Sequence, residues 1–307
     1  MGRILVIRGG ALGDFILTLP VIRLLREAFP KAHLEVLGYQ QFVRLAEAGG
    51  LVDATRSIEY GRLAPFFARQ TILDPDLMAY FGSFNVVVSY LFDPDGHFEK
   101  NLERSKVKTL LQGIHKPAEG QGHASLQLAQ PLESLALYPN EANTPEKLEI
   151  PSARKATPSA RTLALHPGSG SAAKNWPIAR WIEFATTSID RKLADQVLLL
   201  TGEVEASTGV NTTLRAGLED KVPLSHLDHR PLTEVACALT QCHAFLGNDS
   251  GISHLAGALG VPTLALFGPT DPAVWSPWGR AVLALRSETQ AIEDIEVSTV
   301  LEAFSSM

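Results

Sequence analysis

The sequence predicts an α/β protein with two domains, each built around a parallel β-sheet. Short apolar runs alternate with longer amphipathic segments along the chain, which is the pattern of βαβ units. The chain has 307 residues, more than a single hydrophobic core usually holds. A stretch rich in Pro and Asn, from 138 to 159, separates two alternating halves. We therefore expect an N-terminal domain over 1–155 and a C-terminal domain over 156–307, with the last helix packing back on the first domain.

The first half contains strand-like runs at 3–7, 33–38 and 85–91. The run RILVI is apolar from its second residue, as expected for a strand buried on both faces of a parallel sheet. The segment from 14 to 29 that follows is amphipathic and predicts a helix. Pro20 lies inside this segment and predicts a kink or a break, because proline removes a helix hydrogen bond.

A glycine-rich turn from Arg8 to Gly13 joins the first strand to this helix, and Asp14 is expected to open the helix. The dinucleotide fingerprint G-x-G-x-x-G is excluded, because its spacing requires glycine where Arg8 stands. Two interpretations of Asp14 stay open. It is a helix N-cap, or it is a catalytic group, because ligands of α/β sheets bind at the carboxyl ends of the strands.

The second half contains strand-like runs within 161–166, 197–201, 243–248 and 261–267. Gly168 to Ser171 follow the first of these runs and Lys174 comes three residues later, so this loop suits a phosphate group, although an exposed flexible loop is the alternative. Glu203 follows the second run, where a carboxylate binds ribose hydroxyls or is simply solvated.

The third run of the second half ends at Asn248 and Asp249, and Ser250 and Gly251 then open a helix that carries His254. Free N–H groups at a helix start bind anions. Capping by Asp249 and packing of His254 are the structural alternatives. Because the carboxyl ends of parallel strands share one edge of a sheet, the three loops together predict a nucleotide-diphosphate site.

Composition limits the classes of function and the location. The net charge of −6 argues against a nucleic-acid-binding protein. The chain's two cysteines, Cys237 and Cys242, form neither a zinc pattern nor a disulfide framework. No apolar run is long enough for a signal peptide or a membrane span, so we expect a cytoplasmic protein without a transmembrane segment.

Taken together, the motifs resemble glycosyltransferase family 9, which contains the bacterial ADP-heptose:lipopolysaccharide heptosyltransferases. The matching stretches are ILVIRGGALGDFILTLP, HPGSGSAAKNWP, TGEVEA and NDSGISHLAGALGVPTLALFGPTDP, together with His123 in GHASLQLA. The resemblance implies the GT-B architecture, with two facing Rossmann-like domains. It also implies an inverting transfer of heptose from ADP-heptose to a lipopolysaccharide inner-core acceptor, without metal or cofactor, at the inner face of the inner membrane.

The resemblance also implies roles for individual residues. Asp14 is the general base that deprotonates the acceptor hydroxyl, and Lys174 meets the charge of the leaving diphosphate. Glu203 contacts the adenosine ribose, and the backbone from Leu227 to Leu232 reads the adenine. The donor-binding residues are Gly13, Ser169, Gly170, Ser171, Glu203, Asp249, Ser250, Gly251 and His254.

The acceptor side departs from the family pattern in the segment SYLFDPDGHFEKN. An anionic acceptor needs local positive charge on a protein of net charge −6, so we expect Arg62 and Lys100 to bind it. A rival interpretation assigns a divalent cation to the D-x-D sequences Asp93 to Asp95 and Asp74 to Asp76. Two further alternatives are a nucleotide-sugar epimerase of GT-B fold and a nucleotide-sugar-binding protein without activity.

Overall fold

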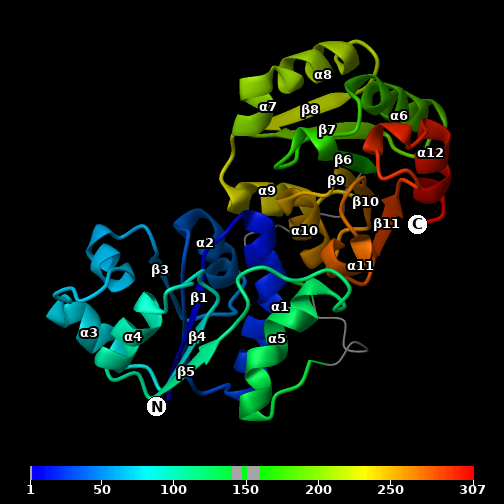
Figure 1. Ribbon diagram of the computed structural model, residues 1–307. Coiled ribbons are helices and arrows are strands. Elements are labelled where there is room, and N and C mark those ends of the chain that lie inside the picture. Colours follow the sequence, from blue (N-terminus) through cyan, green and yellow to red (C-terminus); the bar gives the residue numbers. More distant parts are fainter. Residues whose placement is uncertain (1, 140–146, 151–159) are drawn as a thin grey trace. The chain divides into compact units, whose positions relative to one another are not determined.

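The chain forms two compact units, Met1–Asn143 and Thr144–Met307 (Figure 1). The computed structural model describes residues 2–139, 147–150 and 160–307. The predicted domain boundary between 155 and 156 lies outside the described residues.

The first unit is a five-stranded parallel sheet in the order β3-β2-β1-β4-β5, with helices between consecutive strands. Its strands are β1 (Arg3–Arg8), β2 (His33–Gly38), β3 (Ala54–Ser57), β4 (Val86–Ser89) and β5 (Thr109–Gln112). Its helices are α1 (Leu12–Ala28), α2 (Gln40–Ala48), η1 (Gly61–Phe67), α3 (Pro75–Gly82), α4 (His97–Arg104), α5 (Ala124–Ala129) and η2 (Gln130–Leu135).

Helix α1 corrects two details of the predictions. It begins at Leu12, two residues before Asp14, and it runs through Pro20 without a break. Asp14 is therefore the third residue of the helix rather than its N-cap, and Gly13 lies in the helix rather than in the turn. The break expected at Pro20 is absent because the buried face of α1, which includes Leu17, holds the helix against the sheet.

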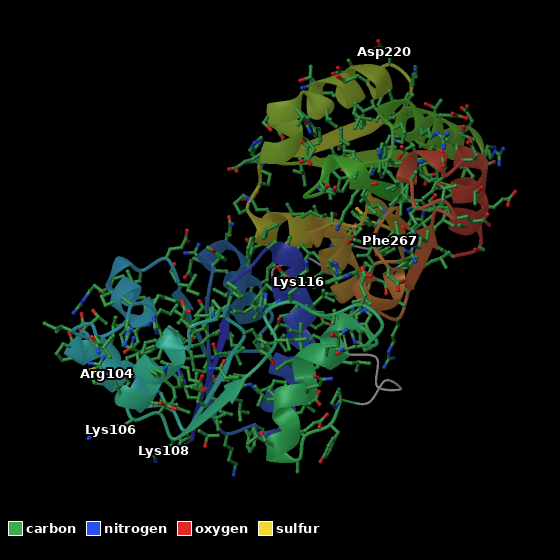
Figure 2. The ribbon with its side chains drawn as sticks, viewed as in Figure 1. Arg104, Lys106, Lys108, Lys116, Asp220 and Phe267 are labelled. Atoms are coloured by element: carbon green, nitrogen blue, oxygen red, sulfur yellow. The ribbon has the colours of Figure 1, made fainter. Side chains whose placement is uncertain are left out.

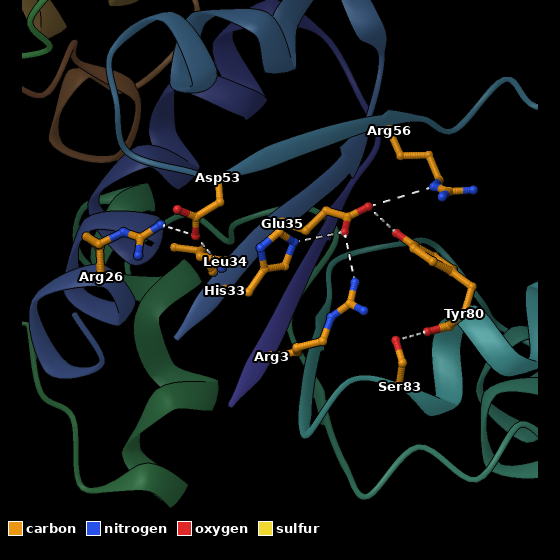
Figure 3. Close-up of polar contacts among 9 residues, drawn as sticks. All are labelled: Arg3, Arg26, His33, Leu34, Glu35, Asp53, Arg56, Tyr80 and Ser83. Atoms are coloured by element: carbon orange, nitrogen blue, oxygen red, sulfur yellow. Dashed lines mark hydrogen bonds and ion pairs between the residues drawn. The ribbon is translucent and has the colours of Figure 1, made fainter. Parts of the chain in front are cut away.

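At the amino-terminal end of this sheet, a buried carboxylate contacts side chains from several neighbouring elements (Figure 3). Glu35 of β2 is 5% exposed, and its carboxylate accepts a 2.7 Å hydrogen bond from the Tyr80 hydroxyl. Arg3, His33 and Arg56 each place a nitrogen within 3.7 Å of it. Burial beside Glu35 raises the pKa of Tyr80, which keeps the phenol protonated as a donor.

The second unit is a six-stranded parallel sheet in the order β11-β10-β9-β6-β7-β8. Its strands are β6 (Thr162–His166), β7 (Gln196–Thr201), β8 (Leu224–Asp228), β9 (Ala244–Asn248), β10 (Thr263–Phe267) and β11 (Val282–Arg286). Its helices are η3 (Ala172–Lys174), α6 (Ile178–Asp190), α7 (Glu203–Thr208), α8 (Val210–Leu218), α9 (Leu232–Leu239), α10 (Gly251–Ala258), α11 (Pro272–Trp275), η4 (Ile292–Asp294) and α12 (Val297–Ser305).

Aromatic side chains fill the core between this sheet and α6. Trp176 and Trp181 are at most 2% exposed and lie edge to face with centroids 5.4 Å apart. Phe304 of α12 packs on Phe184 of α6, so the last helix belongs to this core. Its expected packing on the first unit stays a prediction.

The predicted α/β class is confirmed, and all seven strand-like runs named from the sequence contain strands. The outer strands β3, β5 and β8 lack the long continuous apolar runs that mark buried strands. The fourth outer strand, β11, has the apolar run VLAL, but it was not predicted as a strand. Within the described part of the chain, no helix combines the length and apolar character needed to cross a bilayer.

Candidate active site

Asp14 lies just after the carboxyl end of β1, where the strand order of the first sheet reverses between β1 and β4. Its carboxylate accepts a 2.9 Å hydrogen bond from the N–H of Ala11 and lies 3.3 Å from the Arg8 guanidinium. The Asp14 side chain keeps 32% of its surface exposed. The carboxylate is thus fixed in direction and still open to a substrate.

Arg8 also belongs to this site. In the sequence it served only to exclude the dinucleotide fingerprint. It is 2% exposed, donates to the carbonyls of Asp14 and His115, and lies over the ring of Tyr90. Burial lowers the pKa of the Arg8 guanidinium, and the neighbouring Asp14 carboxylate opposes that shift. The signal available in the sequence was an arginine directly after the apolar run ILVI.

The turn needs glycine at position 10 for two reasons. Its φ of +90° is unfavourable for other residues, and a Cβ there would lie 2.5 Å from the Asp14 carboxylate oxygen. Glycine at position 10 therefore leaves room for the Asp14 carboxylate.

The second sheet brings two predicted residues together where its strand order reverses, between β6 and β9. The Lys174 ammonium lies 2.6 Å from the Asp249 carboxylate, which also accepts a 2.7 Å bond from the Thr270 hydroxyl. Lys174 follows β6, Asp249 follows β9 and Thr270 follows β10, so three loops converge here. The Asp249 carboxylate thereby holds the Lys174 ammonium near the start of α10.

A buried amide holds these loops in place. Asn248 is fully buried; its Nδ2 donates to the Pro167 carbonyl at 2.6 Å, and its Oδ1 accepts from the N–H of Trp176. The Ser169 hydroxyl lies 2.7 Å from Oδ1 of Asn175. Thr270 and Asn175 were not predicted, because neither stands out from its neighbours in the sequence.

Two buried side chains, His166 and Glu205, lie beside the loop that begins at Gly168. His166 ends β6, and the carboxylate of Glu205 on α7 accepts a 2.6 Å bond from the N–H of Gly202. Burial lowers the pKa of the His166 imidazole, and the Glu205 carboxylate opposes that shift. The Ser250 hydroxyl lies 3.4 Å from Nδ1 of His166.

Gly168→Ala should destabilise the second unit, because a Cβ there would lie 1.5 Å from Oε1 of Glu205. Forced overpacking of this kind costs about 1–3 kcal/mol. Gly170→Ala is the matched control, since its Cβ would meet nothing within 4 Å. Thermal unfolding of both variants is the measurement, and equal midpoints would show that Glu205 does not restrict the loop.

The other predicted donor residues differ in exposure. Ser250 caps α10 by accepting a hydrogen bond from the N–H of Ser253, and Gly251 is the first residue of that helix. His254 is 4% exposed. Glu203, the first residue of α7, is exposed, as are Gly170 and Ser171.

The predicted acceptor residues have different surroundings. Arg62 forms ion pairs with Asp74 and Asp76 and a hydrogen bond with Tyr60. Lys100 of α4 is exposed and lines a hollow from which Arg62 is absent among the described lining residues. Their binding of the acceptor stays a prediction.

The two D-x-D sequences cap helices. The Asp93 carboxylate accepts hydrogen bonds from the N–H groups of His97 and Glu99 at the start of α4. Asp74 is the N-cap of α3 and accepts from the N–H of Asp76. Within residues 2–139, 147–150 and 160–307, no group of three or more His, Cys, Asp or Glu side chains could hold a metal ion.

The family model of glycosyltransferase family 9 (heptosyltransferase) matches residues 124–304. The chain belongs to this family. The predicted family is therefore confirmed, and the match includes Lys174 and Asp249.

Curated relatives of this family 9 chain include lipopolysaccharide heptosyltransferase 1 of Pseudomonas aeruginosa, 34% identical over 133 residues. That match covers 43% of this chain and 36% of the relative. Lipopolysaccharide heptosyltransferase 2 of Escherichia coli is 29% identical over 115 residues, 37% of this chain and 32% of the relative. The chain thus aligns with about a third of the length of the curated relatives that it matches.

Solved structures with a similar fold cover nearly the whole chain. A glycosyl transferase family 9 protein from Veillonella parvula has a TM-score of 0.79 at 18% identity, covering 99% of this chain and 96% of that one. The E. coli heptosyltransferase WaaC with ADP has a TM-score of 0.77 at 16% identity, covering 99% of both chains. These likenesses confirm the predicted GT-B fold class.

Proposed function

We propose that this chain is an inverting, metal-independent glycosyltransferase that moves a heptose from ADP-heptose to a lipopolysaccharide inner-core acceptor. The observation that carries the proposal is the Lys174–Asp249 pair at the start of α10, in the part of the chain that matches the family. A cation and free N–H groups at one helix start suit a leaving diphosphate. ADP is the ligand of the similar WaaC structure, and the curated relatives are heptosyltransferases.

In the proposed reaction the acceptor hydroxyl oxygen attacks the anomeric carbon of the donor. Asp14 takes the hydroxyl proton as the new carbon–oxygen bond forms, and the bond from the anomeric carbon to the diphosphate oxygen breaks. The departing diphosphate carries the electron pair of that bond, and Lys174 meets its growing charge. A single displacement of this kind inverts the anomeric centre.

The proposed donor contacts beyond the diphosphate are those that the family resemblance implies. Glu203 binds the ribose hydroxyls, Ser250, Gly251 and His254 lie near the sugar and diphosphate, and the segment from Leu227 to Leu232 reads the adenine. Gly13 and the loop from Ser169 to Ser171 complete the donor set. Arg62 binds the anionic acceptor.

The direct test incubates the full chain with ADP-heptose, with and without a deacylated inner-core acceptor. Heptose transfer with inversion at C1, observed by NMR of the product, supports the proposal. Hydrolysis without transfer, epimerisation of the donor, or binding without turnover would each contradict it. Other sugar nucleotides at matched concentration serve as controls for the choice of donor.

Transfer should survive EDTA, because Lys174 and the N–H groups at the start of α10 neutralise the diphosphate in this proposal. Asp93 and Asp74 are already engaged as helix caps. The initial rate with and without chelator is the measurement. Loss of activity that magnesium or manganese restores would assign a metal to the reaction and contradict this part of the proposal.

A further inference from the structure

A positively charged hollow of about 440 Å³ opens on the first unit beside α4. Its lining includes Arg69, Thr71, His97, Lys100 and Arg104, and none of the described lining residues is acidic. Among the described residues, neither Arg69 nor Lys100 forms an ion pair. Three cations gathered without a carboxylate, on a chain of net charge −6, indicate a surface that meets an anion.

The wall of this hollow is held in place before any ligand arrives. Asn101, 4% exposed, donates from Nδ2 to the carbonyls of Phe66 and Ala68 at 2.9 and 3.1 Å. Arg104 donates to Oδ1 of Asn101 and to the carbonyl of Thr71. The segment 66–71 is therefore fastened to α4, while Arg69 and Lys100 keep exposed side chains.

Two exposed apolar side chains are sequence neighbours of the lining residues. Ile72 follows the lining residue Thr71 and is 93% exposed, although isoleucine is among the residue types most often buried. Phe67 precedes the lining residue Ala68; it is 42% exposed and stacks on the buried Phe98 with centroids 4.7 Å apart. A soluble phosphate would use the cations and leave Ile72 in water.

The positive charge continues past the hollow along the chain. Lys106 and Lys108 follow Arg104, and both are exposed at the end of α4 and the start of β5 (Figure 2). Cations beside an exposed apolar side chain match the interface of an anionic bilayer, where phosphates lie above acyl chains.

We propose that Arg69, Lys100 and Ile72 form a docking surface for anionic phospholipid headgroups. Arg69 and Lys100 bind headgroup phosphates, and Ile72 enters the boundary of the acyl chains. Lys100 then contacts the bilayer rather than the acceptor sugar that the sequence suggested. This inference depends on neither the donor nor the transfer reaction.

The test is flotation of the full chain with vesicles made of phosphatidylcholine and phosphatidylglycerol in a ratio of about two to one. We expect binding that falls with salt and is absent on pure phosphatidylcholine. Arg69→Gln/Lys100→Gln should lower partitioning about 30-fold, since each cation near an anionic surface contributes about fivefold. Ile72→Ser should lower it about tenfold, as expected for a lost apolar anchor, with the salt dependence unchanged.

Matched variants separate docking from general charge and from misfolding. Lys31→Gln/Arg44→Gln removes two other exposed cations of the first unit, and Tyr138→Ser removes another exposed apolar side chain. Both should partition like the parent, and all variants should share its unfolding midpoint, because Asn101 and Arg104 are left intact.

Three results would overturn the proposal. The first is a parent chain that does not float with phosphatidylglycerol vesicles. The second is an equal loss of partitioning in the control variants. The third is a raised KM of Arg69→Gln/Lys100→Gln for a deacylated acceptor with unchanged vesicle binding, which would return the hollow to the acceptor. In the first case, binding of inorganic phosphate by the parent chain would identify a soluble anion as the ligand.

Discussion

Asp14→Asn should lower the rate of heptose transfer by about 10²- to 10⁴-fold, the contribution of a typical general base. Asparagine still accepts the hydrogen bond from the N–H of Ala11 but cannot take a proton. ADP binding should stay near the parent value, because the proposed nucleotide contacts involve other residues. Single-turnover transfer and calorimetric ADP titration measure the two effects separately.

The Arg8 ion pair calls for a specific control. Asp14→Asn leaves the buried Arg8 guanidinium without its carboxylate, which by itself destabilises the fold. The double variant Arg8→Gln/Asp14→Asn removes both charges. If an unpaired arginine causes the loss of transfer, the double variant regains activity; if Asp14 is the base, it stays inactive. Near-parent turnover of Asp14→Asn would leave Asp14 only the role of fixing the helix start.

The fold was predictable from the sequence wherever burial on both faces forces a continuous apolar run. The strands β1, β6, β9 and β10 carry such runs and hold the centres of the two sheets. The edge strand β3, with the sequence ATRS, is half exposed, so its pairing partner and not its own pattern decides its conformation. The start of α1 was also missed, because Gly13 reads as a turn residue yet lies inside the helix.

The site was predictable only in part, for a similar reason. Lys174 and Asp249 each stand in a loop after a strand, so the rule for parallel sheets brings them to one edge. The rule cannot say that they form a 2.6 Å ion pair, nor that Thr270 shares it, because these contacts join positions 75 and 21 residues apart. Arg8 was overlooked because its burial beside Asp14 depends on how the turn folds back.

Lys174→Ala should slow the chemical step by about 10²- to 10³-fold, since losing one donor that meets developing charge has effects of this size. It should also raise the KM for the donor, because the ammonium meets the diphosphate in the ground state as well. The Asp249 carboxylate, 7% exposed, would then face the diphosphate without its cation and with the Thr270 hydroxyl bound to it. Part of the rise in KM is therefore repulsion rather than lost attraction.

Lys174→Ala/Asp249→Asn separates these two contributions. Removing the carboxylate charge should bring the donor KM part of the way back, whereas kcat should stay low because no cation meets the leaving group. Lys221→Ala, an exposed lysine of the same unit, is the matched control and should behave like the parent. Unchanged kcat and donor KM in Lys174→Ala would exclude the lysine from the site. A kcat restored in the double variant would instead assign Lys174 the task of neutralising Asp249, since the leaving diphosphate would then need no cation at this position.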